Sequence, residues 1–237
     1  MCFNATSSFV SAAALIPAGI YTLHAARDGD IRYRPLAAFP FLFGVQQTLE
    51  GVLWLELLPD TAGEICGIAF GSALAFLFFA YLLWPGLVPL AAWRVEPPGL
   101  RRRLFAATAV LGGLFGGSLF LPLIINPDWL QVFIVRGSIL YHPQLIYDPY
   151  IDRELVRAIY ALIVAAPLIG SSDRMVREFG VLILASVIVS ALAFGYAFVS
   201  IWCFFAALLS AFLVLRLPRR ESVAPPRIHR AGPHGAG

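Results

Sequence analysis

Hydrophobic positions fill seven stretches of this chain, and polar positions gather in the connections between them. The stretches cover approximately residues 7–26, 36–58, 64–84, 104–125, 153–170, 175–194 and 197–217. A helix needs about 20 mostly apolar residues to span a bilayer, and each stretch is close to that length. The pattern therefore predicts an all-α integral membrane bundle of seven transmembrane helices.

The composition agrees with a chain that has little soluble mass. Of 237 residues, 59% are hydrophobic and 13% are charged, and the mean hydropathy is +0.80. Soluble domains carry about 25% charged residues, and seven spanning helices leave no room for an ordinary soluble domain. We expect a transmembrane domain over residues 1–218 and a disordered cytoplasmic tail over 219–237, which has few apolar residues.

The distribution of arginine predicts the orientation. The chain has no lysine, and all of its 17 basic residues except Arg136, Arg153 and Arg157 fall in connections on one side of the predicted bundle. The positive-inside rule then places the N-terminus outside and the C-terminus in the cytoplasm, in a bacterial cytoplasmic (inner) membrane. This basic collar favours contact with anionic membrane lipids, and no nucleic-acid partner is expected. The absence of lysine also excludes a rhodopsin-like retinal Schiff base.

Polar side chains in the stretch over 36–58 form the strongest candidate site. Gln46, Gln47, Glu50 and Trp54 share one stripe of a helix because they are three or four residues apart. Glu50 would lie about 12 Å below the outer end of that helix. A carboxyl at this depth is protonated, paired, or in contact with water or a ligand. Interhelical hydrogen bonding by these groups, and an interfacial role for Trp54, are the alternatives.

Other polar residues fall in the outer half of the predicted bundle, where an outward-facing polar cavity would accommodate them. Arg157 is expected one turn inside its helix, and Trp202 in the outer half of the last helix. Arg157 would be the counter-charge for Glu50 or Glu154. A local pair between Glu154 and Arg157 at the interface is the alternative. Gln46, Gln47, Glu50, Trp54, Arg157 and Trp202 are therefore candidate ligand-binding residues.

The connection over residues 126–152 predicts a small hairpin. Two runs of β-forming residues flank Gly137-Ser138, which suits a two-residue turn. Such a hairpin would lie over the cavity mouth as a lid. His142 on this hairpin is the only histidine on the outer side. We treat it as a further candidate for ligand binding, with a structural role as the alternative.

Three cysteines, Cys2, Cys66 and Cys203, all fall on the outer side of the predicted bundle, which is the oxidising side in a bacterium. Their spacing gives no metal-binding signal and no CxxC occurs, so we expect no metal site. If Met1 is removed, Cys2 would become an N-terminal nucleophile; an ordinary buried thiol is the alternative. Cys2, Glu50 and Cys203 are the catalytic candidates if the protein is an enzyme. The sequence indicates no particular cofactor.

Four separated motifs resemble an uncharacterised family of bacterial multi-helix membrane proteins whose members begin Met-Cys-Phe-Ser. The motifs are Met1-Cys2-Phe3-Asn4-Ala5-Thr6, Phe43-Gly44-Val45-Gln46-Gln47-x-x-Glu50-Gly51-x-x-Trp54, Leu83-Trp84-Pro85-x-x-Val88-Pro89-Leu90-x-x-Trp93 and Ser200-Ile201-Trp202-Cys203-Phe204-Phe205-Ala206-Ala207. The resemblance implies seven helices and no established activity. This chain departs from the pattern at Asn4 and in Phe78-Phe79-Ala80, which lacks a histidine of the family.

Two classes of function remain. The first is a ligand-binding membrane protein, a sensor or small transporter, with an outward cavity for a small or lipid-like ligand. The second is a membrane-embedded enzyme that acts on a lipid-like substrate through Cys2, Cys203 or Glu50. Alkaline ceramidases share the seven-helix shape, but no histidine falls in the last six predicted helices to hold their zinc. Gly112, Gly113, Gly116 and Gly117 suit close helix packing or a homo-oligomer, which also allows a role as an assembly subunit.

Overall fold

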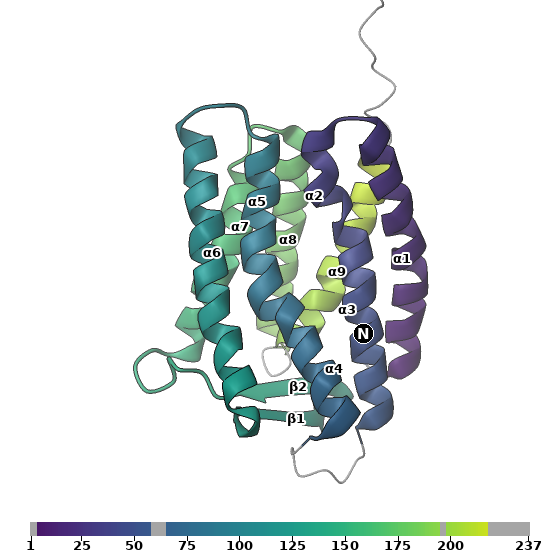
Figure 1. Cartoon of the computed structure of the whole chain (residues 1–237), viewed down its shortest axis with the longest axis vertical. Coiled ribbons are helices and arrows are strands. Elements are labelled where there is room, and N and C mark those ends of the chain that lie inside the picture. Colours follow the sequence, from purple (N-terminus) through teal and green to yellow (C-terminus); the bar gives the residue numbers. More distant parts are fainter. Residues whose placement is uncertain (1–3, 58–64, 195–197, 218–237) are drawn as a thin grey trace, which may run out of the picture.

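The computed structural model describes residues 4–57, 65–194 and 198–217, which form an up-and-down helical bundle closed at one end by a β-hairpin (Figure 1). In chain order the elements are α1 (Ala5–Asp28), η1 (Ile31–Tyr33), α2 (Arg34–Ala37), α3 (Phe39–Glu56), α4 (Gly67–Leu77), η2 (Phe78–Leu83), α5 (Trp84–Val95), α6 (Leu100–Ile125), η3 (Pro127–Trp129), β1 (Leu130–Val135), β2 (Ser138–Pro143), α7 (Arg153–Ile169), α8 (Arg174–Phe194) and α9 (Phe198–Arg216).

The predicted helical class is confirmed, because each of the seven apolar stretches is mainly helical where the structure describes it. Five segments are long and apolar enough to cross a membrane: Ala5–Arg27, Ile31–Glu56, Gly67–Val95, Leu100–Ile125 and Arg174–Leu192. They indicate a membrane protein. Seven spans and the N-out orientation stay predictions, and the expected tail over 219–237 lies outside the described residues.

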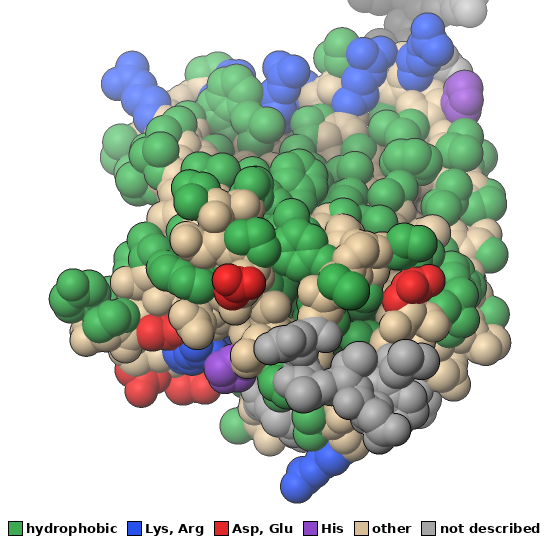
Figure 2. Space-filling view, turned by 60° about the horizontal axis from the view of Figure 1, so that its bottom comes forward, with side chains coloured by type: hydrophobic (Ala, Val, Ile, Leu, Met, Phe, Trp, Pro, Cys, Tyr) green, Lys and Arg blue, Asp and Glu red, His purple; other side chains and the backbone are tan. Residues whose placement is uncertain are grey.

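The two ends of the bundle differ in charge. One end, here called the hairpin end, carries β1, β2 and the start of α1 (Figure 1). The opposite end, the arginine end, carries most arginines of the described residues, and an apolar belt separates the two ends (Figure 2). The arginine end contains Arg27, Arg32, Arg34, Arg94, Arg101, Arg102, Arg103, Arg174, Arg177 and Arg216.

The sequence indicates a helix over 64–84 that reaches the interface at Trp84-Pro85-Gly86 and a kinked apolar extension over 87–93. In the structure α4, η2 and α5 instead form one unbroken helical segment. The reason is a π-helical turn at η2, in which the Trp84 N–H bonds the Phe79 carbonyl, five residues back. In the same pattern the N–H of residue 85 would donate a hydrogen bond to the Ala80 carbonyl, but residue 85 is a proline and has no N–H. Pro85 is therefore accommodated, and the Ala80 carbonyl is left for another partner.

Glycines of α6 allow it to pack closely on this segment. A Cβ atom added at Gly112 would lie 1.9 Å from the Pro85 carbonyl oxygen, and one at Gly116 would lie 2.4 Å from the Tyr81 carbonyl oxygen. Gly113 has nothing within 4 Å of that position and Gly117 only a leucine of its own helix. Of the four predicted packing glycines, two thus place α6 against η2 and α5, and the other two leave a groove on the outside of α6.

The predicted hairpin is present, but its turn lies one residue earlier than expected. Val135 pairs with Ser138, so Arg136 and Gly137 form the turn, with φ angles of 51° and 71°. Type I′ turns require a positive φ at both central residues because only then does the turn match the strand twist. The sequence prediction, Gly137-Ser138, was therefore wrong, since it did not anticipate an arginine in the left-handed region.

A buried carboxylate joins two connections at the arginine end. Glu96, which follows α5, accepts hydrogen bonds from the Ser172 hydroxyl (2.6 Å), the Ser172 N–H (2.9 Å) and the Ser171 hydroxyl (3.1 Å) in the α7–α8 turn. Arg101 lies 3.5 Å away. Burial alone would raise the pKa of Glu96, but these hydrogen bonds and Arg101 lower it below the ordinary value of 4.5.

This arrangement predicts acid sensitivity. Because folding lowers the pKa of Glu96, its stabilising effect is complete above about pH 4.5 and is lost as the pH falls through the lowered value. Glu96→Gln should cost about 1.5–3 kcal/mol at pH 7, the scale of a hydrogen bond to a charged group. In thermal unfolding in detergent, the melting temperatures of wild type and variant should converge as the pH is lowered from 7 to 3. A gap that stays constant, or the same behaviour in the exposed control Glu56→Gln, would contradict this role.

Candidate functional site

One face of α7 forms a wall that runs from the hairpin end into the core. Asp152 caps the start of this helix by accepting the Glu154 N–H at 2.7 Å. From there, residues at helical spacing of three or four share one face: Arg153, Val156, Arg157, Tyr160, Val164 and Leu168. The first four line a cavity near the hairpin end, and the last two lie deeper.

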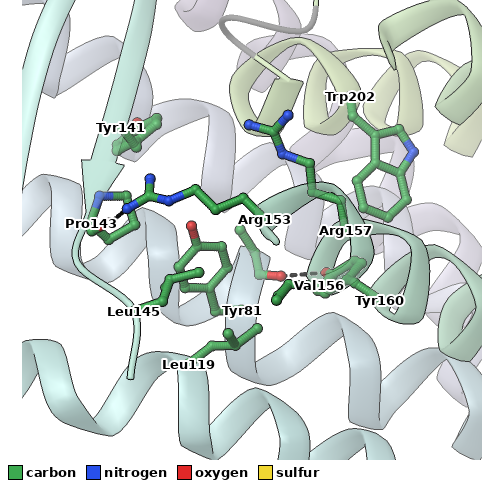
Figure 3. Close-up of a pocket in the computed structure, with 11 residues that line it drawn as sticks. Tyr81, Leu119, Tyr141, Pro143, Leu145, Arg153, Val156, Arg157, Tyr160 and Trp202 are labelled. Atoms are coloured by element: carbon green, nitrogen blue, oxygen red, sulfur yellow. Dashed lines mark hydrogen bonds between the residues drawn. The ribbon is translucent and has the colours of Figure 1, made fainter. Parts of the chain in front are cut away.

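The cavity at the hairpin end, here called the outer cavity, has a volume of about 80 Å³. The hairpin and the loop after it, the segment α4–η2–α5, α6, α7 and α9 all contribute to it (Figure 3). Its lining residues are Ala80, Tyr81, Leu119, Tyr141, Pro143, Leu145, Arg153, Val156, Arg157, Tyr160 and Trp202. A site built by so many distant segments depends on the fold and cannot be read from a local motif.

The π-turn supplies one wall of the outer cavity. The Tyr160 hydroxyl donates a hydrogen bond to the Ala80 carbonyl, the acceptor that Pro85 leaves unused (Figure 3). This bond fixes the Tyr160 ring. The rings of Tyr160 and Trp202 form an edge-to-face pair with centroids 5.2 Å apart. π-turns occur often at functional sites, and here the turn orients an aromatic side chain of the cavity.

The two arginines of the outer cavity are held differently. Arg153 bonds both carboxylate oxygens of Asp148, at 2.9 and 2.6 Å, and the Pro143 carbonyl at 3.0 Å. Burial alone would raise the pKa of Asp148, but Arg153 and the backbone N–H of Leu145 lower it, so Asp148 stays ionised and keeps Arg153 in place. Arg157 pairs at 2.6 Å with Glu154, which is 75% exposed. An exposed ion pair is weak, so Glu154 restrains Arg157 less than Asp148 restrains Arg153.

The charged residues that line the outer cavity are both basic. Two of its residues, Arg153 and Arg157, are cationic, and none of the described lining residues is acidic. Asp148 and Glu154 instead line a shallow groove on the outside of the hairpin end. Three tyrosines and one tryptophan supply ring surface around the two guanidinium groups. A guanidinium binds carboxylate or phosphate with two parallel hydrogen bonds.

The structure brings some of the candidate residues together and separates others. Arg157 and Trp202 both line the outer cavity. Arg157 makes the local pair with Glu154 that the sequence left as an alternative. His142 does not face the cavity: it is exposed, because alternation along β2 turns its neighbours Tyr141 and Pro143 inward instead.

The glutamine and glutamate residues of α3 lie within the bundle. Gln46 accepts a hydrogen bond from the Trp84 indole N–H at 2.9 Å, as expected for interhelical hydrogen bonding. Gln47 donates to Glu50 at 3.3 Å, and both side chains are fully buried. None of these three lines the outer cavity. Trp54 is half-buried and packs with the apolar cluster between α3, α4 and the hairpin.

Of the catalytic candidates Cys2, Glu50 and Cys203, only Glu50 has a described side chain. Cys66 is an exposed free thiol just before α4. Cys2 lies outside the described residues, and so does the side chain of Cys203. In the ranges 4–57, 65–194 and 198–217, no group of three or more His, Cys, Asp or Glu residues could hold a metal ion.

Sequence reasoning missed Tyr81, Tyr141, Arg153 and Tyr160 as cavity residues. Arg153 was detectable, because it precedes Arg157 by four residues on the face of α7 that also carries Tyr160. Tyr81 gave no such signal, since its direction depends on the π-turn. The inward direction of Tyr141 depends on the hairpin register, which the sequence placed one residue off.

A family model covers residues 1–228 and describes a family of unknown function, DUF6629. The chain belongs to DUF6629. The expected resemblance to an uncharacterised family is thereby confirmed, and no activity comes with it. No curated protein and no solved structure matches the chain.

Proposed function

We propose that this protein is a membrane-embedded binding protein of seven spanning helices, whose outer cavity opens outward and takes a small anionic ligand with an apolar part. The observation that carries the proposal is the pairing of two guanidinium groups with aromatic rings in a cavity without a described acidic lining residue. Binding sites combine an apolar lining with a few polar groups that orient the ligand.

Arg157 is the residue that would form an ion pair with the ligand's carboxylate. Arg153 is held by three hydrogen bonds from one side, whereas Arg157 has the exposed Glu154 as its salt-bridge partner. An incoming carboxylate would replace Glu154 at Arg157 with little loss, because that exposed pair is screened by water. Within the cavity the new pair is less screened than the old one. This difference favours binding.

The size of the cavity limits the ligand. About 10–15 Å³ of such volume holds one water-sized group, so about 80 Å³ holds only a handful of non-hydrogen atoms. This fits a small carboxylate better than a phospholipid. Contact with anionic lipid headgroups belongs instead to the arginine end, whose collar we assign to the cytoplasmic leaflet.

The test is a titration of the purified full-length protein in detergent with three small probes of similar length: butyrate, butyramide and butylamine. We expect the acid alone to bind by calorimetry. Arg157→Gln should weaken its binding about 10- to 100-fold, the scale of a charged hydrogen bond. Arg136→Gln, at the exposed hairpin turn, is the matched control and should leave binding unchanged. Equal binding of the amide or amine, or an unchanged Arg157→Gln, would refute the proposal.

A further inference from the structure

A second, smaller cavity lies deeper in the bundle and shares a wall with the outer one. This inner cavity has a volume of about 30 Å³. Tyr160 and Trp202 line both cavities, so the two cavities adjoin at this aromatic pair. The residues lining the inner cavity are Phe39, Phe43, Trp84, Val88, Tyr160, Val164, Leu168, Phe179, Ile183 and Trp202.

The inner cavity is suited to hydrocarbon and not to water. Two of its aromatic residues already use their polar atoms elsewhere: Trp84 donates its N–H to Gln46 at 2.9 Å, and Tyr160 donates its hydroxyl to Ala80. The other lining side chains, apart from Trp202, have no polar atom. A buried water needs two to four polar partners, and apolar cavities of this kind stay dry and take apolar guests.

The shared wall has one fixed and one adjustable side. Tyr160 is fixed by its hydrogen bond to the backbone of the π-turn. Trp202 meets the Tyr160 ring at an angle of 84°, an edge-to-face contact that adds about 0.5–1.5 kcal/mol to the burial of the two rings. A contact this weak can open when a group inserted between the rings buries comparable apolar area.

We infer that the inner cavity is the specificity pocket for a short hydrocarbon group of the same anion. This inference rests on the proposed function. The carboxylate lies beside Arg157 in the outer cavity, and its hydrocarbon part passes between Tyr160 and Trp202. About 30 Å³ accommodates only two or three water-sized groups. The ligand class is therefore a carboxylate with a few carbon atoms beyond the outer cavity, not a long-chain fatty acid.

The experiment measures chain-length dependence with straight-chain carboxylates from propionate to decanoate, titrated into the full-length protein in detergent. For wild type we expect the affinity to rise about fourfold for each methylene group that becomes buried and then to level off. Val164→Phe, which fills the inner cavity from α7, should remove this rise and leave the affinity for propionate unchanged. Trp202→Ala should move the plateau to longer chains.

The controls separate this inference from a general packing defect. Val187→Phe adds the same bulk at another buried position and should keep the wild-type chain-length dependence. If Val164→Phe does not fold, Ile183→Phe fills the same cavity from α8. If the affinity still rises with chain length in both Val164→Phe and Ile183→Phe as it does in wild type, the inference is overturned. In that case, weaker binding of every acid to Arg157→Gln would still support the proposed function. No binding of any acid to wild type would reject both.

Discussion

Gly112→Ala is expected to destabilise the protein by about 3 kcal/mol or more, although alanine is the better helix former. The added Cβ atom would lie 1.9 Å from the Pro85 carbonyl oxygen, which belongs to the backbone of α5 and cannot rotate away. The two helices would have to separate, and overpacking of this kind typically costs 1–3 kcal/mol and sometimes more. Thermal unfolding in detergent measures the effect.

The neighbouring glycine gives the matched control. Gly113→Ala places the same atom where nothing lies within 4 Å. It should be neutral or stabilising by about 0.5–1 kcal/mol, because glycine is a poor residue within a helix. The two variants differ by one position and should have effects of opposite sign. Equal melting temperatures would show that α6 and α5 are not packed as described.

Trp84→Ala is the second change with a large expected effect, a loss of about 3–5 kcal/mol for a buried aromatic side chain. Trp84 is 4% exposed. It stacks on Phe43 with ring centroids 4.0 Å apart and meets Phe39 edge-on at 5.4 Å. Removing the ring would also open the inner cavity, which it lines. Unfolding midpoints and retention of a monodisperse detergent complex measure the loss.

Two further variants separate the components of this effect. Trp84→Phe keeps an aromatic ring against Phe43 but removes the N–H that donates a hydrogen bond to Gln46. It should lower the free energy of unfolding by about 1–3 kcal/mol. Trp93→Ala removes a half-buried ring of the same helix that lies below the guanidinium groups of Arg94 and Arg102. Its cost should be about 1 kcal/mol, as for exposed cation–π pairs. If Trp93→Ala were as damaging as Trp84→Ala, the core position of Trp84 would not explain the loss.

The helices of this protein could be predicted from the sequence because the signal is local. Runs of apolar residues such as 104–125 coincide with α6, and the hairpin was detectable from β-forming runs around a glycine. Two local details were not predictable by the same reasoning. Nothing in Trp84-Pro85-Gly86 indicates the π-turn that carries the helix past Pro85 without a break. Arg136 gives no sign that it adopts a positive φ.

The candidate site was predictable only in part, because it is not local. Depth in the membrane correctly grouped Arg157 and Trp202 on one end of the bundle, and both line the outer cavity. Depth does not tell which way a side chain faces around the helix axis. Gln47 and Glu50 were grouped with the same outer half, yet they hydrogen-bond each other and do not line this cavity. Relative rotation of helices depends on packing, which includes glycine contacts that no single stretch contains.

The π-turn of η2 also sets the phase between the two halves of its helical segment. An α-helix advances about 100° per residue, and a π-turn contains one more residue than an α-turn. The side chains of α5 are therefore rotated by about that angle from where an uninterrupted α-helix would put them. A single residue in Phe78–Leu83 thus determines that Trp84 faces Gln46 and that Pro85 faces the glycines of α6. In this segment, the number of residues matters as much as their chemistry.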